Sequence, residues 1–353
     1  MEFKKHQIKK GETLQSIAEK NKISVDELRN FHNSNSSFTQ TITSDYLPIH
    51  LEQVFLEIKP ITENSKEFIH DVAEELISVA RYRCEQTVVM KLSGIIHSHA
   101  DTKREFEVKK YQKDGKQYVK IKMLENIVEA YQKQLELAIK MVSEIDMIKC
   151  DVTVSLKEDG KIAEIVNFEE IQKKWKEKKK VLDNDFSFMR DKKAQSDIQN
   201  FLNLNDQQFS NQENIINDLY TKLFFDVFFD KYLTNDDFLK DYSKVYYSQL
   251  FDGYGVDLKF TQHILAENKD LVEIRKVSTL DQTKLDQVFL NNQYEYKFKP
   301  IVKYQFSTYN FSVREHCTIN TTDRWIEKSD ITIIEEVKNN VQVLIDYKLR
   351  KIE

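Results

Sequence analysis

The sequence predicts an α+β protein, in which a small βααβ module precedes a larger body built from an antiparallel sheet and helices. Three observations predict this class. Two stretches alternate apolar and polar residues around an Asp-Gly pair, which is typical of β-hairpins. A segment with apolar residues three or four positions apart follows each hairpin, which favours amphipathic helices. The final third alternates again, which predicts further antiparallel strands.

Composition limits the classes of function. The chain has 353 residues, enough for two or three domains, and a net charge of -5. This charge gives no global basic field, so no nucleic-acid partner is expected. Cys84, Cys150 and Cys317 lie far apart in the sequence, which predicts buried free thiols rather than disulfides or a metal site.

The chain also lacks the usual targeting signals. The first residues contain no apolar signal segment, and no run of about 18 apolar residues occurs anywhere. We therefore expect no membrane span. We expect a cytoplasmic protein, unless a dedicated secretion machine exports it.

Residues 1–60 predict the small module. Ile8 lies in a short alternating stretch that predicts an edge strand, Gly11 suits a tight turn, and Thr13 can cap a helix. Ser24, with Glu27 three residues later, forms a second capping signal. The region around Phe55 and Ile58 predicts the closing strand. Apolar residues at helical spacing fill the two helices: Leu14, Ile17, Ala18, Val25 and Leu28.

This run resembles a LysM domain, whose pattern is a short strand, Gly-Asp/Glu-Thr-Leu, a helix of small residues, then Ser-x-x-x-Leu and Asn. The residues that match in order and spacing are Gly11, Glu12, Thr13, Leu14, Ile17, Ala18, Ser24, Val25, Leu28 and Asn33. The resemblance implies a groove for N-acetylglucosamine-containing glycan. Its lining by resemblance would be Gly11, Glu12, Thr13, Asn30, Phe31 and His32.

The module departs from the family at its end. A polar stretch from Ser34 to Asp45 intervenes before the closing strand, and Glu52-Gln53 stands where Gly-Gln is expected. The inserted stretch alters one wall of the implied groove. Two interpretations therefore stay open, a glycan-binding module and a structural or protein-docking module.

Residues 61–182 predict an α+β domain of hairpins and helices. Residues 63–81 and 125–147 have helical periodicity, and residues 83–92 are strand-like. Asp114-Gly115 and Asp159-Gly160 mark the turns of the two hairpins. Residues 183–212 are polar and predict a linker or a surface segment.

Residues 213–353 predict two helices followed by a β-rich domain, which we allow to pack with residues 61–182 as one body. Residues 213–233 are apolar around most of a helix, and Phe224, Phe225, Phe228 and Phe229 are expected in the core. Residues 236–250 predict a second helix. Alternation over 294–309 predicts a strand, with Pro300 at an edge, and Asn339-Asn340 predicts a terminal hairpin turn.

No catalytic constellation is recognisable, so no catalytic residue, cofactor or metal is expected. His97 and His99 lack further ligands nearby in sequence, and His316 and Cys317 would point to opposite faces of a strand. The Lys173–Lys180 run favours a solvated helix end over a nucleic-acid site.

These observations favour a non-enzymatic LysM-containing adaptor or structural protein with protein partners, of the kind found in contractile tail-like or secretion machines. The alternatives are a binder of peptidoglycan or N-acetylglucosamine oligomers, and a secreted toxin-type enzyme whose active site is assembled from distant residues.

Overall fold

The structure is a computed structural model of the chain. It describes residues 3–8, 12–21, 23–36, 42, 47, 51, 53–57, 75–130, 136–186 and 192–352. The chain divides into two compact units, Met1–Asp71 and Val72–Glu353, and each is described by itself. No described helix is long and apolar enough to cross a membrane.

The N-terminal unit has the predicted β-α-α-β order. Its elements are β1 (Phe3–Gln7), α1 (Leu14–Lys20), α2 (Val25–Asn35) and β2 (Gln53–Glu57). The two strands are antiparallel, with Lys5 opposite Phe55. The unit has its own core, made by Leu14, Ile17, Ala18, Leu28, Ile42, Leu51, Val54 and Leu56. Both apolar helix faces predicted from the sequence therefore pack on the small sheet.

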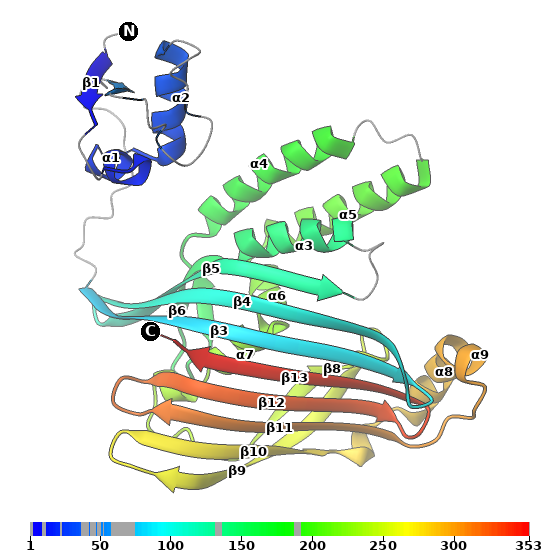
Figure 1. The fold of residues 1–353 in the computed structure, drawn as a ribbon. Coiled ribbons are helices and arrows are strands. Elements are labelled where there is room, and N and C mark those ends of the chain that lie inside the picture. The colour runs from blue at the N-terminus through cyan, green and yellow to red at the C-terminus, as the bar shows by residue number, and fades with distance from the viewer. Residues whose placement is uncertain are drawn as a thin grey trace. The chain divides into compact units, whose positions relative to one another are not determined.

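The larger unit is organised by one sheet of eleven antiparallel strands in the order β7-β6-β5-β4-β3-β13-β12-β11-β10-β9-β8 (Figure 1). Every neighbouring pair is consecutive in sequence except β13 and β3, where Leu349 lies opposite Cys84. The C-terminal strand thus joins the two halves of the sheet. The strands are β3 (Glu75–Leu92), β4 (Ile95–Lys113), β5 (Lys116–Ala130), β6 (Asp151–Leu156), β7 (Ile162–Ile165), β8 (Tyr242–Tyr247), β9 (Gly255–Glu267), β10 (Leu271–Leu280), β11 (Tyr309–Asn320), β12 (Trp325–Val337) and β13 (Val341–Lys351).

Helices cover one face of this sheet, which we call the inner face. Figure 1 shows α6, α7 and strand β8 behind the central strands, and α3, α4 and α5 beside β5. The helical segments are α3 (Glu136–Lys149), α4 (Phe168–Phe186), α5 (Lys192–Ser210), α6 (Gln212–Tyr220), α7 (Leu223–Phe228), η3 (Lys231–Leu233), η4 (Gln282–Lys284), α8 (Gln287–Lys297) and α9 (Lys299–Val302).

Aromatic side chains fill the space between α7 and the inner face. The Phe224 ring stacks on Phe106 of β4 with 4.0 Å between the ring centroids, and Phe228 meets Tyr82 of β3 edge-on. Phe224, Phe225, Phe228 and Phe229 are all at most 2% exposed, which confirms that this group is core. Such contacts add to the free energy gained from burying the rings.

The three predicted turns are confirmed. Asp114 and Gly115, between β4 and β5, both have positive φ angles, of 50° and 75°. Gly160 (φ 76°) lies between β6 and β7, and Asn339 (φ 65°) lies between β12 and β13. Positive φ angles match the turn to the twist of the two strands, and Gly, Asn and Asp tolerate them best.

Two predicted helices are wrong over part of their length. The predicted helix over 63–81 is wrong at residues 75–81, which belong to β3; its earlier part lies outside the described residues. The predicted helix over 125–147 is wrong at 125–130, which continue β5, and α3 starts only at Glu136. Pairing along long neighbouring strands stabilises an extended backbone whatever the local periodicity.

In two further segments the predicted type of secondary structure is wrong. Residues 242–247 form β8 instead of a helix, while residues 294–302 lie in α8 and α9 instead of a strand. Pro300 lies in the first turn of α9, where its missing N–H costs no helical hydrogen bond. Much of the polar stretch over 183–212 forms α5, which buries Leu202 and Phe209.

Candidate functional site

The implied glycan site lies where α1 begins. Thr13 caps this helix: its hydroxyl accepts a hydrogen bond from the backbone N–H of Ser16 at 3.1 Å, and the Ser16 hydroxyl accepts one from the N–H of Thr13 at 2.9 Å. This reciprocal arrangement satisfies two N–H groups that a helix start leaves without partners. The exposed Thr13 side chain is therefore held in a fixed position on the surface.

Glu12, next to this cap, is held by His6 and Lys20. Its carboxylate lies 2.9 Å from Nε2 of His6 on β1 and 3.8 Å from Nζ of Lys20 at the end of α1. No motif in the sequence links His6 to Glu12, so this contact could not be predicted. The pair fixes the carboxylate beside the segment that contains Gly11, and Gly11 itself lies outside the described residues.

The other three predicted site residues lie within α2 and face different directions. Asn30 is exposed and Phe31 is half-buried, whereas His32 is completely buried. The His32 ring stacks on Phe55 of β2 at 5.4 Å, and its Nδ1 accepts a hydrogen bond from the Phe55 backbone N–H at 3.2 Å. Successive helical residues are about 100° apart, so one helix cannot present all three to a groove. His32 belongs to the core of the unit.

The stretch that separates α2 from β2 is tied to α2 by Asn33. The Asn33 carboxamide accepts a hydrogen bond from the backbone N–H of Ile42 at 2.7 Å and donates one to the Ile42 carbonyl at 2.9 Å. The Ile42 side chain is fully buried in the core of the unit. The inserted stretch therefore contributes one core residue, held by a side chain that belongs to the family pattern.

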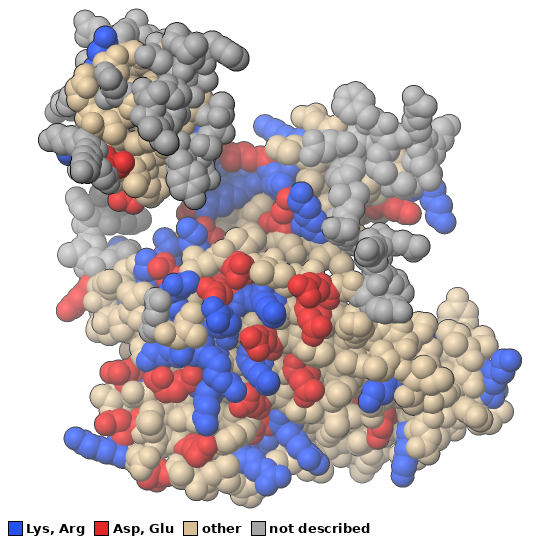
Figure 2. Space-filling model, in the orientation of Figure 1, with Lys and Arg blue, Asp and Glu red and all other residues tan. Residues whose placement is uncertain are grey.

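The larger unit presents a second candidate surface, on the face of the sheet opposite to α7, which we call the outer face. Figure 2 shows Lys and Arg interleaved with Asp and Glu over these strands. The register places Glu85 opposite Lys348, and Lys348 opposite Asp330. Opposite charges in directly facing positions stabilise a sheet modestly.

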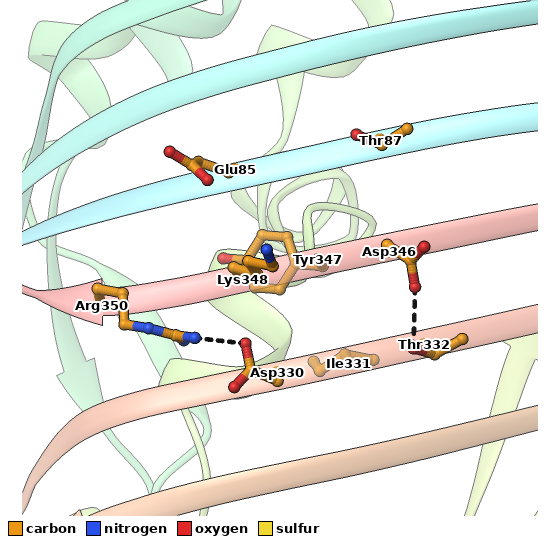
Figure 3. A pocket seen from close by; sticks show the side chains of 9 residues that line it. All are labelled: Glu85, Thr87, Asp330, Ile331, Thr332, Asp346, Tyr347, Lys348 and Arg350. Atoms are coloured by element: carbon orange, nitrogen blue, oxygen red, sulfur yellow. Dashed lines mark hydrogen bonds and ion pairs between the residues drawn. The ribbon is translucent and has the colours of Figure 1, made fainter.

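A shallow depression of about 540 Å³ lies on this outer face, over β3, β13 and β12 (Figure 3). Short side chains at Thr87 and Thr332 leave room between the longer charged ones. The Arg350 guanidinium donates to Asp330 at 2.6 Å across its floor, and the Thr332 hydroxyl donates to Asp346 at 2.9 Å. The depression can accept polar groups of either charge.

The side chains tested for catalysis or metal binding do not converge. His316 and Cys317 point to opposite faces of β11: His316 lies 2.7 Å from Glu273, whereas Cys317 is 1% exposed. His97 and His99 are exposed on β4. Among the described residues, no three His, Cys, Asp or Glu side chains are grouped so that they could hold a metal ion.

Two comparisons with known proteins found a similarity. The model of the family described as "LysM domain" matches residues 6–31. No curated protein matches the chain. A solved structure described as "Lipid-protein interactions in lipovitellin" is similar at 9% identity and a TM-score of 0.35, over 78% of this chain and 25% of that chain. This chain therefore spans about a quarter of that one. Residues 6–31 of the present chain match the LysM domain, and they lie within the short β-α-α-β unit that the sequence predicted.

Proposed function

We propose that this protein is a non-enzymatic binding protein whose LysM domain recognises N-acetylglucosamine-containing glycan and so attaches the large sheet unit to it. One observation carries the proposal: residues 6–31 match the LysM family and lie in a unit of β-α-α-β order in which both helices are capped. A binding module of this kind needs no reactive side chains, only fixed hydrogen-bonding groups at its surface.

Glu12 and Thr13, beside the start of α1, supply such hydrogen-bonding groups. The Glu12 carboxylate accepts hydrogen bonds, and the exposed Thr13 hydroxyl can both donate and accept them. Sugar hydroxyls and acetamido groups need both kinds of partner. Because the cap holds Thr13, and His6 and Lys20 hold Glu12, little side-chain entropy is lost on binding.

Isothermal titration calorimetry of the full chain with N-acetylglucosamine oligomers tests the proposal. We expect saturable binding that Glu12→Ala weakens by about tenfold, which corresponds to the loss of one well-placed hydrogen bond to a charged group. Glu19→Ala, at an exposed position of α1, is the matched control and should bind as the wild type does. Absence of heat with folded wild-type protein contradicts the proposal.

A second candidate function is a protein adaptor in a contractile tail-like or secretion apparatus. The interleaved charges of the outer face favour it, because complementary charges fix the register of protein partners. The test is co-purification from the native cell, comparing the wild type with a Lys348→Glu, Arg350→Glu variant. Recovery of the same partner with both proteins, or of no secretion component with either, argues against this role.

A further inference from the structure

A large cavity lies on the inner face of the sheet in the larger unit. It measures about 810 Å³ and extends from β3, β12 and β13 across to β8, with α6 and α7 forming a wall. Ile331, Ile333 and Ile345 line its apolar side, and each is at most 7% exposed. This volume lies within the usual range of small-molecule sites, about 300–1,000 Å³.

A buried charged pair lies on the inner face of the sheet beside the cavity. Lys276 of β10 and Glu315 of β11 are directly opposite in the sheet register, with 3.3 Å between Nζ and Oε2. They are only 6% and 8% exposed. Their inward-facing neighbours include the apolar Ile274 and Val313 and the polar Ser278. Burying two charges costs several kcal/mol of hydration each, so core packing alone does not account for them.

The Lys276 ammonium has donors to spare. Its second carboxylate neighbour, Asp230, is 3.7 Å away, and the ammonium makes no hydrogen bond of good geometry with any residue that the structure describes. Burial by itself lowers the pKa of Lys276, but Glu315 and the other nearby groups, Asp230 among them, together outweigh burial and raise the pKa well above its ordinary value. Lys276 therefore stays charged. A buried ammonium needs hydrogen-bond acceptors, and the cavity has room for a ligand that supplies them.

The cavity lining as a whole has an excess of positive charge. Five lysines and three carboxylates line it, which leaves two positive charges in excess; they are Lys161, Lys231, Lys240, Lys244, Lys276, Asp226, Asp230 and Glu315. Lys244 pairs with Asp226 of α7, and Lys161 lies 3.9 Å from Asp230. In a cavity with low-dielectric walls, this excess favours an anion.

We propose that this cavity binds a small amphipathic anion, an alkyl chain carrying one carboxylate. The carboxylate would accept the free donors of Lys276, and the alkyl chain would lie against Ile331, Ile333 and Ile345. An inorganic anion would leave the isoleucines unused, and a neutral chain would leave the charge excess unbalanced. This inference is independent of the LysM domain and of any glycan.

The test measures binding to the full chain by titration calorimetry. The three probes have equal chain length: decanoate, decan-1-ol and decylamine, each used below its aggregation concentration. We expect saturable binding of decanoate to one site per chain. The alcohol and the amine should bind at least about tenfold more weakly, because neither can accept from Lys276 as a carboxylate does.

Variants at the charged pair separate binding from folding. The double variant Lys276→Met, Glu315→Leu removes both buried charges together, which proteins usually tolerate, and should weaken decanoate binding by at least about tenfold. Glu315→Gln removes the carboxylate that competes for Lys276 and should tighten binding. If Lys276 and Glu315 only stabilised the fold, both the double variant and Glu315→Gln would bind decanoate more weakly. Lys348→Met, on the outer face, is the matched control and should bind within about twofold of the wild type.

Three results would overturn the proposal. One is the absence of saturable decanoate binding to folded wild-type protein. Another is equal affinity for the acid, the alcohol and the amine, which would indicate a general apolar site. The third is unchanged binding in the Lys276→Met, Glu315→Leu variant. Thermal unfolding of each variant identifies any that has lost its fold. If the double variant is unfolded, Glu315→Gln tests the proposal instead: tighter decanoate binding supports it and weaker binding contradicts it.

Discussion

Glu335 of β12 accepts a hydrogen bond from the Tyr309 hydroxyl of β11 at 2.8 Å, inside the core of the larger unit. The same carboxylate accepts from the backbone N–H groups of Gln249 at 2.6 Å and Leu250 at 3.3 Å, and from the Ser248 hydroxyl. Glu335 is 1% exposed. One buried side chain thus satisfies the backbone of the turn that follows β8.

Removing this carboxylate should destabilise the larger unit. Glu335→Leu takes their acceptor from the Gln249 N–H and from the hydroxyls of Ser248 and Tyr309, and we expect it to lower the free energy of unfolding by about 2–5 kcal/mol. Urea denaturation followed by circular dichroism measures the change. Glu336→Leu, the next residue on the same strand, faces the other side of the sheet and should change it by less than about 1 kcal/mol. Equal losses in both variants would contradict this role.

Glu335 should also make stability depend on pH. Burial raises the pKa of this carboxyl above its ordinary value, although its hydrogen-bond donors act in the opposite direction. Between the ordinary value and the raised one, the folded protein binds more protons than the unfolded chain, so stability falls as pH rises through that window. Glu335→Gln cannot titrate there. The wild type should therefore lose stability relative to Glu335→Gln as pH rises, in urea denaturations from about pH 4 upward. A constant difference between the two contradicts the prediction.

Gly160 should resist substitution for a specific steric reason. Its φ angle is 76°, and a Cβ atom added there would lie 2.1 Å from the backbone carbonyl oxygen of Asp230. Gly94 has a similar φ of 80° with nothing within 4 Å of its Cβ position, so Gly94→Ala measures the backbone strain alone. We expect about 1 kcal/mol for Gly94→Ala and at least about 2 kcal/mol more for Gly160→Ala, by urea denaturation. Equal costs would exclude the close approach.

The three cysteines should be unreactive in the folded protein. All are buried free thiols, and burial raises the pKa of Cys84 and Cys150 to about 12 and also raises that of Cys317. Thiolate is the reactive form, so labelling by a disulfide reagent at pH 8 should be at least about a hundredfold slower than for an exposed thiol. A Lys348→Cys variant supplies that exposed thiol. All three native thiols should react in guanidinium chloride; rapid labelling of the native wild type would contradict the burial.

Asn33 should be the residue that secures the inserted stretch of the LysM domain. Asn33→Ala removes both hydrogen bonds to the Ile42 backbone, and we expect α2 to lose about 1–3 kcal/mol of local stability. Hydrogen exchange at the Leu28 amide, which is bonded within α2 to the Ser24 carbonyl, reports this change. Gln15→Ala, at an exposed position of α1, is the control. Equal exchange in the two variants would show that Asn33 does not hold the stretch.

Local signals in the sequence predicted the elements whose causes are themselves local. Thr13 and Ser24 predicted the starts of two helices, because a capping side chain bonds to N–H groups only three residues away. The same holds for the hairpins at Gly115 and Gly160, where φ angles decide the turn. Residues 75–81 and 242–247 were predicted as helix, because their apolar spacing fits a helix and the strands that pair with them are distant in sequence.

The candidate site was predicted only in part. The sequence located Glu12 and Thr13 beside a capped helix, but it could not place His32, whose burial depends on Phe55 from the closing strand. Lys276 and Glu315 were missed altogether. The only signal was a charge at an inward position of each alternating strand, and its meaning depended on the register that places β10 beside β11.

The amino-acid sequence by itself determined the LysM domain, its two capped helices, the three hairpin turns and the identity of the aromatic core, since all of these follow from residues close together in the chain. Only the tertiary structure decided that β13 joins β3, which face of the sheet is buried, and which charges face the inner cavity. Those features depend on pairing between strand residues up to about 270 positions apart, as between Tyr82 and Lys351, and no local preference encodes the partner.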